Sequence, residues 1–206
     1  KGEYGEGDQF IGVVVPNLRV VAKKHFDADF DTLRELLASP YHEYRLTALL
    51  ALTYRYAKFK DLASREACVN FYVSQVDAIN NWDLVDLSCY KILGHWLFDK
   101  DKQLLYDWAK EDHLWKQRIA MITCMHFVKQ GEFKDALAIA DLLQHHPHDL
   151  IHKAVGWILR EIGKENEQLL VDYLTPRYKE MPRTMLRYAI ERFEEGKRKA
   201  FLHSKV

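Results

Sequence analysis

The chain has 206 residues, of which 48% are hydrophobic and 29% are charged, so it is long enough for one folded domain with a substantial core. No apolar run approaches the roughly 18 residues that a membrane-spanning helix needs, and no signal peptide is visible, which argues against a membrane protein. The formal net charge is zero, whereas nucleic-acid-binding proteins usually carry an excess of basic residues. The charge is uneven, however, because residues 177–206 contain nine Lys and Arg against four Glu.

The opening of the chain is rich in glycine. Residues 2–8, GEYGEGD, contain three glycines, and such a loop could approach a phosphate backbone closely. It lacks the Lys-Ser/Thr pair of a P-loop, so a flexible lead-in is the alternative interpretation. The chain begins at Lys1 rather than at a methionine, and we therefore expect a further N-terminal piece to precede it.

Beyond residue 16 the apolar residues recur at intervals of three and four, as in amphipathic helices. Short polar or proline-bearing stretches interrupt this pattern, for example at Ser39-Pro40 and His146-Pro147. The pattern predicts paired helices at 31–38 with 41–57, 61–77 with 81–97, 101–110 with 114–130, 132–144 with 149–162, and 166–175 with 182–193.

The second helices of these pairs start near residues 41, 81, 114, 149 and 182, at intervals of 33 to 40 residues. Such intervals are typical of helical-pair repeats such as HEAT units. Because one pair cannot bury its apolar stripe alone, neighbouring pairs stack into a solenoid, and their second helices line one surface, commonly a concave one. The sequence therefore predicts an all-α HEAT-like helical-pair repeat solenoid, an α-α superhelix that forms a single domain over residues 1–206.

Trp82 and Asp86 lie four residues apart in the stretch NNWDLVD at 80–86. On a helix, this spacing places the indole and the carboxylate side by side on one face. Two less specific interpretations stay open. Trp82 could be a core residue at a helix start that Asn80 or Asn81 caps, and Asp86 could be a surface carboxylate.

Arg118 and Trp157 lie on later second helices, which is the internal argument that they converge with Trp82 and Asp86. Two aromatic faces, a carboxylate and a guanidinium would form a shallow site that attracts cations beside a group that binds phosphate. Few reactions need that set, and one of them is removal of a positively charged base from DNA. Alternatively, Arg118 pairs with a carboxylate, and Trp157 packs structurally beside Gly156.

Cysteine and histidine give no support for a metal site. Cys68, Cys89 and Cys124 are far apart and form no C-x-x-C pair, which fits buried thiols in a reducing cytosol. The histidines of 145–152 cluster, but no acidic or cysteine partner completes a zinc site and Pro147 breaks its geometry. We therefore expect no metal.

The chain resembles the AlkD-like DNA alkylation repair enzymes, the HEAT-like repeat DNA glycosylases. The matching stretches are KGEYGEGDQFIGVVVP at 1–16, NWDLVD at 81–86, WKQRIA at 115–120, KAVGWILRE at 153–161 and MPRTMLRYA at 181–189. The resemblance implies a curved solenoid whose concave face holds duplex DNA. It also implies excision of cationic N3- and N7-alkylated purines without a base-binding pocket and without a cofactor. By motif position, Trp82, Asp86 and Trp157 are the catalytic residues, and Arg118 contacts the DNA.

Other residues are candidates for binding DNA phosphates. Lys153 lies one helical turn before Trp157, Arg183 and Arg187 are four residues apart, and Tyr4 could reach the backbone from the glycine-rich loop. A solvated face is the alternative for the charged residues. The expected protein is a monomeric, monofunctional glycosylase of the bacterial cytoplasm. A non-catalytic relative that binds damaged or branched DNA is one competing hypothesis, and a helical scaffold for a peptide or protein, which the zero net charge favours, is another.

Overall fold

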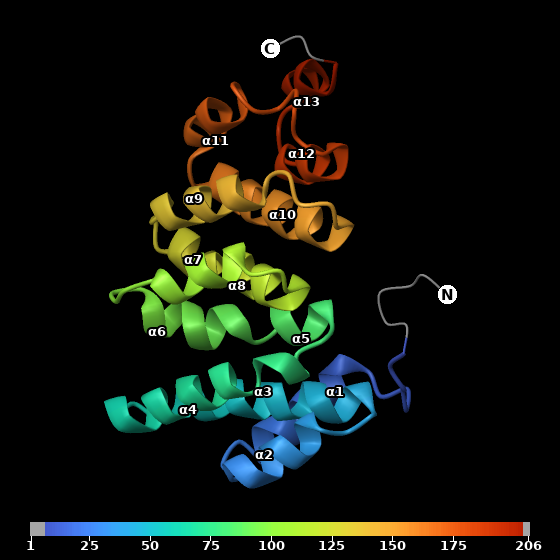
Figure 1. Ribbon diagram of the computed structural model, residues 1–206, viewed down its shortest axis with the longest axis vertical. Coiled ribbons are helices and arrows are strands. Elements are labelled where there is room, and N and C mark those ends of the chain that lie inside the picture. Colours follow the sequence, from blue (N-terminus) through green and yellow to red (C-terminus); the bar gives the residue numbers. More distant parts are fainter. Residues whose placement is uncertain (1–6, 204–206) are drawn as a thin grey trace. The chain divides into compact units, whose positions relative to one another are not determined.

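The computed structural model describes residues 7–203, and this part of the chain is built from helices and their connections (Figure 1). The chain forms two compact units, residues 1–99 and 100–206, and each is described here by itself. The predicted all-α, helical-repeat fold class is confirmed. The assignment of the chain to a single domain and the concave face both stay predictions. No helix within residues 7–203 is long and apolar enough to cross a membrane.

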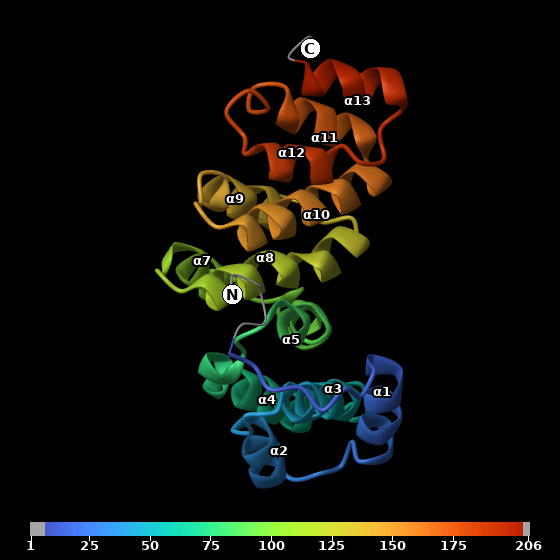
Figure 2. The same ribbon diagram turned by 90° about the vertical axis from the view of Figure 1, so that its right-hand side faces the viewer.

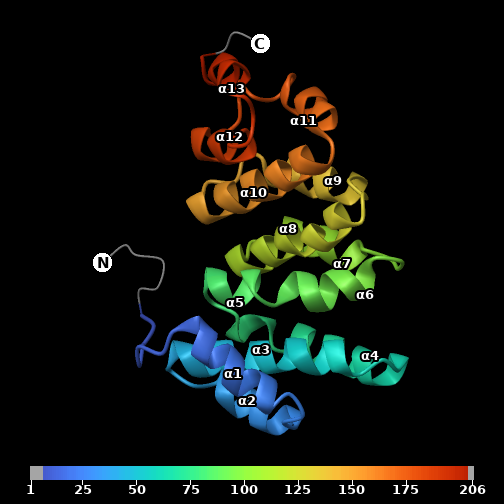
Figure 3. The ribbon, with the colours of Figure 1, turned by 180° about the vertical axis from the view of Figure 1, so that it is seen from behind.

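Four helices form most of the first unit. They are α1 (Val15–Lys24), α2 (Phe30–Leu37), α3 (His42–Lys58) and α4 (Leu62–Ser74). Both α1 and α2 pack against α3 (Figure 3). The N-cap of α2 is Asp29, whose side chain accepts a hydrogen bond from the Thr32 amide. Aspartate is one of the residues preferred at this position.

Helix α3 is the core of this unit. Most of its side chains are buried, including Leu46, Leu49, Leu50 and Leu52. The segment before α1 joins this core through the backbone. The Gln9 amide donates to the Pro40 carbonyl and the His42 amide donates to the Gln9 carbonyl, which forms one isolated parallel bridge. Residues 7–14 are thereby attached to the start of α3.

After α4 the first unit ends in short elements: η1 (Val76–Ala78), α5 (Trp82–Asp86), the π-helical turn η2 (Tyr90–Gly94) and α6 (His95–Leu97). The prediction of one continuous helix over 81–97 is therefore wrong. Ser88 supplies a physical reason, because its hydroxyl donates to the Leu84 carbonyl and competes with the helical ladder at the end of α5. Wide π turns often occur at functional sites.

The second unit contains α7 (Gln103–Lys110), α8 (Leu114–Lys129), α9 (Lys134–Leu143), α10 (Asp149–Glu165), α11 (Glu167–Leu174), α12 (Arg183–Ala189) and α13 (Glu195–Leu202). Helix α10 packs against both α8 and α12, so the predicted second helices are neighbours in this unit (Figure 2). Two helices were not predicted, α1 and α13, and α12 ends at Ala189 rather than near residue 193. Cys68, Cys89 and Cys124 are buried, as predicted.

Candidate functional site

Helix α5 presents Trp82 and Asp86 from its two ends. Trp82 is its first residue and is 45% exposed, whereas Asp86 is its last residue and is only 8% exposed. The interpretation of Trp82 as a core residue is therefore wrong. The start of α5 was predicted correctly, because Asn81 is the N-cap and its side-chain oxygen accepts a hydrogen bond from the Trp82 amide at 2.7 Å. An exposed indole thus lies one helical turn from a largely buried carboxylate.

Neutral phenols lie close enough to Asp86 to interact with it electrostatically. The pKa of Tyr72 is raised well above its ordinary value, first by burial and then by electrostatic interactions with Cys89 and Asp86. The pKa of Tyr90 is also raised, first by burial, then by Cys89, with a smaller effect of Asp86. Both tyrosines consequently stay protonated at neutral pH, and neither adds a negative charge beside the carboxylate.

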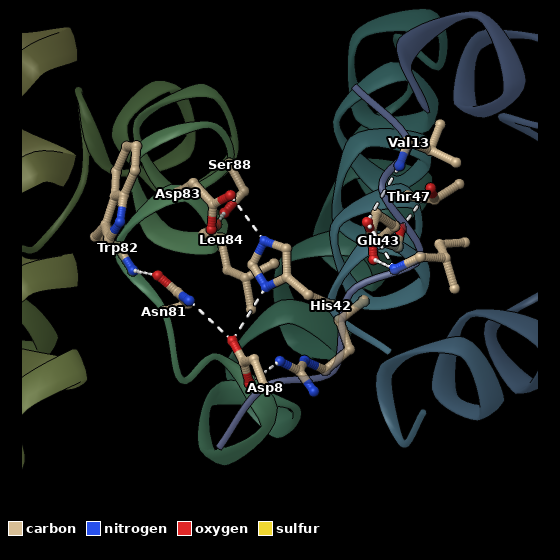
Figure 4. Close-up of polar contacts among 12 residues, drawn as sticks. Asp8, Val13, His42, Glu43, Thr47, Asn81, Trp82, Asp83, Leu84 and Ser88 are labelled. Atoms are coloured by element: carbon tan, nitrogen blue, oxygen red, sulfur yellow. Dashed lines mark hydrogen bonds and ion pairs between the residues drawn. The ribbon is translucent and has the colours of Figure 1, made fainter. Parts of the chain in front are cut away.

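A polar cluster surrounds the first turn of α5, and Figure 4 shows it. The Asn81 amide nitrogen donates to Asp8 Oδ2 at 2.8 Å, and Arg45 Nη2 contacts Asp8 Oδ1 at 2.5 Å. The His42 imidazole lies between two carboxylates, with Nε2 2.8 Å from Asp83 Oδ2 and Nδ1 3.2 Å from Asp8 Oδ2. We call Asp8, His42, Arg45, Asn81 and Asp83 the α5 clamp.

The α5 clamp contains a histidine whose surroundings favour its charged form. Burial acts to lower the pKa of His42, but the hydrogen bond and charge of Asp83, together with the charge of Asp8, outweigh it and raise this pKa above its ordinary value. The pKa of Asp8 is lowered: burial acts to raise it, and the hydrogen bonds from Asn81 and Arg45 outweigh that effect. With His42 in its charged form, the clamp holds two positive and two negative groups.

The neighbouring carboxylate, Glu43, holds the segment before α1. Its Oε1 accepts hydrogen bonds from the backbone amides of Gly12 at 2.8 Å, Ile11 at 3.1 Å and Val13 at 3.3 Å. Burial acts to raise the pKa of Glu43, but these backbone donors outweigh it, so the pKa is lowered and the residue stays ionised. No pattern in the sequence predicted these neighbours of the site, which are Asp8, His42, Glu43, Arg45 and Asp83.

The second unit holds the other predicted site residues. Arg118 is 4% exposed, and its Nη1 donates to the Leu150 carbonyl, so part of its guanidinium is used inside the unit between α8 and α10. Trp157 on α10 is partly buried. It follows Gly156, where an added Cβ would come within 2.5 Å of Tyr188 Cβ and 2.6 Å of the Met185 carbonyl oxygen of α12. The role of Arg118 at a DNA phosphate stays a prediction.

The remaining basic candidates lie at the surface of the same unit or at its rim. Lys153 forms an ion pair with Asp149 at 2.8 Å, one turn before it on α10. Arg183 and Arg187 are exposed on α12, and Arg183 donates to the Leu202 carbonyl at 2.9 Å. Tyr4 lies outside the described residues. Convergence of these groups and of Arg118 and Trp157 with α5 stays a prediction.

The clustered histidines bond to the backbone around them. The His148 amide donates to His146 Nδ1 and the Leu150 amide donates to His148 Nδ1, while His152 Nε2 contacts the His146 carbonyl. Across residues 7–203, no group of three or more His, Cys, Asp or Glu side chains is arranged to hold a metal ion.

Comparisons with known proteins place these observations in a family. The sequence profile described as "DNA alkylation repair enzyme" matches residues 2–193. The chain belongs to the DNA alkylation repair enzyme family. A solved structure described as a predicted DNA alkylation repair enzyme from Enterococcus faecalis has the same fold, with a TM-score of 0.71, 16% sequence identity, and coverage of 92% of this chain and 90% of that chain. No curated protein matches the sequence. Family membership confirms the resemblance and indicates a role in DNA alkylation repair, with DNA as the partner.

Proposed function

We propose that this protein is a monofunctional DNA glycosylase that hydrolyses the N-glycosidic bond of cationic N3- and N7-alkylated purines in duplex DNA. The observation that carries the proposal is the pairing of exposed Trp82 with nearly buried Asp86 on α5, in a chain of the DNA alkylation repair enzyme family. An enzyme of this kind works on bacterial DNA in the cytoplasm, as a monomer, and needs neither a metal nor a cofactor.

The chemistry of a cationic base suits these two residues. Alkylation at N3 or N7 gives the purine a positive charge, so it leaves without protonation and the site needs no general acid. As the bond breaks, positive charge moves onto the sugar as an oxocarbenium ion, which a nearby carboxylate stabilises. Asp86 takes this role and orients the attacking water. Its limited solvent access strengthens the interaction, because screening by water is weaker there.

The aromatic and basic residues bind the nucleotide and its flanks. The interaction of one indole face with a cation contributes on the order of 0.5–2 kcal/mol. Trp82 and Trp157 therefore cradle the deoxyribose and the charged base. A guanidinium carries several N–H donors, and Arg118 is the proposed contact to a flanking phosphate. Lys153, Arg183, Arg187 and Tyr4 are proposed contacts to the DNA backbone.

Analysis of the reaction products tests this function. Excess protein is incubated with a duplex that carries one 7-methylguanine, the free base is quantified by mass spectrometry, and strand integrity is measured with and without alkali. We expect free 7-methylguanine and a strand that breaks only after alkali treatment, because no lysine is assigned to Schiff-base chemistry. Duplex binding without base release would move the protein to the non-catalytic DNA-binding relatives. Neither binding nor release would favour a protein-binding scaffold.

A further inference from the structure

The α5 clamp joins three segments that are far apart in the sequence. Asp8 comes from the segment before α1, His42 and Arg45 from the first turn of α3, and Asn81 and Asp83 from the start of α5. These side chains are largely buried: the exposed fraction of the side chain is 5% for His42, 8% for Asp8 and 17% for Asp83. Trp82 lies between Asn81 and Asp83, and its indole extends away from the cluster (Figure 4).

Helix α5 depends on such external contacts. It has only five residues, and a helix of one turn is not stable by itself in water. Its N-cap oxygen on Asn81 bonds to the adjacent Trp82 amide, and the same side chain donates to Asp8. Beyond Asp86 the backbone passes through a turn into the π-helical η2, so no long helix holds α5 from its far end.

We propose that the α5 clamp fixes the first turn of α5 and that His42 is its central positioning residue, which holds Trp82 and Asp86 in the geometry required for base excision. The excision part of this inference rests on the proposed function. His42 Nε2 hydrogen-bonds to Asp83, and Nδ1 lies 3.2 Å from Asp8 Oδ2 as an ion pair. Only the imidazolium attracts both carboxylates by its charge and carries an N–H on each nitrogen, because a neutral imidazole has one N–H donor. Removing that charge leaves two aspartates opposite one cation, Arg45.

The direction of the pH dependence follows from the groups that face His42. They are Asp8 from the segment before α1, Asp83 from α5 and Arg45 from α3, with the uncharged ring of Phe10 5.1 Å away. Because the folded-state pKa of His42 is raised, the clamp is complete below the ordinary histidine pKa of about 6.5 and is lost as the pH rises through the raised value. The site should therefore loosen as the pH rises through the raised pKa of His42.

Two independent measurements test the clamp, and both use the full chain. Hydrogen exchange at the amides of α5 reports its order without any catalysis, and single-turnover release of 7-methylguanine reports excision. Each is followed from pH 6 to pH 9 in the wild type and in His42→Gln, with Asp83→Asn as a milder second variant of similar shape. His25→Gln, an exposed histidine after α1, is the matched control.

We expect α5 exchange in the wild type to accelerate with pH more than intrinsic amide chemistry requires, and base release to fall over the same range. In His42→Gln, α5 should exchange fast at every pH, the alkaline fall should disappear, and release at pH 6.5 should drop roughly 10–100-fold, as misplaced groups cause. His25→Gln should retain the wild-type profile.

The outcomes separate the clamp from the proposed function. Unchanged α5 exchange in both His42→Gln and Asp83→Asn overturns the clamp, whatever the catalytic result. Faster α5 exchange with undiminished base release overturns the positioning role alone. A wild type that shows the expected exchange profile but releases no base overturns the proposed function and, with it, the catalytic role of His42, while the structural clamp is confirmed.

Discussion

Asp86→Asn should lower the single-turnover rate of 7-methylguanine release by about 10²–10³-fold, the cost of removing one preorganised electrostatic contact to the transition state. The amide keeps the shape of the side chain but lacks the negative charge that the oxocarbenium ion requires. Ground-state binding depends on phosphate contacts instead, so duplex affinity at fixed salt should stay close to the wild-type value. Rapid-quench kinetics and fluorescence anisotropy measure the two quantities.

A matched variant shows whether the effect belongs to this one carboxylate. Asp31→Asn removes an aspartate of α2 whose side chain is 88% exposed and pairs with Arg34, and such surface pairs contribute little. It should release base at the wild-type rate. If Asp86→Asn also kept the full rate while it folded and bound normally, the electrostatic role of Asp86 would be wrong.

Gly156→Ala should destabilise the second unit by about 1–3 kcal/mol, the usual cost of overpacking. The added Cβ would lie 2.6 Å from the backbone carbonyl oxygen of Met185 and 2.5 Å from Tyr188 Cβ, so α10 and α12 have to move apart. Chemical denaturation monitored by circular dichroism gives the change. Because Trp157 is the next residue, we also expect slower base release at temperatures where the variant is still folded.

Gly163→Ala is the internal control on the same helix. Its added Cβ would meet Leu170 Cδ2 at 2.5 Å, the end of a side chain that can rotate away, and the next nearest atom is at 3.6 Å. Alanine is favoured over glycine inside a helix by about 1 kcal/mol, so this variant should be near neutral or slightly stabilised. Equal destabilisation by both substitutions would contradict the argument that close backbone packing makes Gly156 necessary.

Local patterns in the sequence predicted the parts of this fold that local interactions determine. The apolar recurrence located α3, α8 and α10 closely, because each buries a long stripe. The spacing of Trp82 and Asp86 also indicated their place on one helix, since four residues span about one turn, although the predicted helix over 81–97 was too long. Helix α1 was missed because the first predicted helix began only at residue 31, although Pro16 occupies a favoured first-turn position.

Long-range contacts explain what the sequence could not show. Asp8 and Asn81 are 73 residues apart, and His42 and Asp83 are 41 apart, so no periodicity links them. The bond between Asp83 and His42 has no signal in a single sequence. The burial of Arg118 was hidden for a similar reason, because its bond to Leu150 depends on how α8 and α10 pack.

Selectivity for leaving-group charge is the central claim, and one comparison tests it most directly. Single-turnover release is measured from two duplexes of one sequence, with cationic 7-methylguanine in one and neutral hypoxanthine at the same position in the other. We predict rapid release of 7-methylguanine and no detectable release of hypoxanthine, because the site stabilises charge and supplies no general acid. Comparable release of both bases would contradict the account.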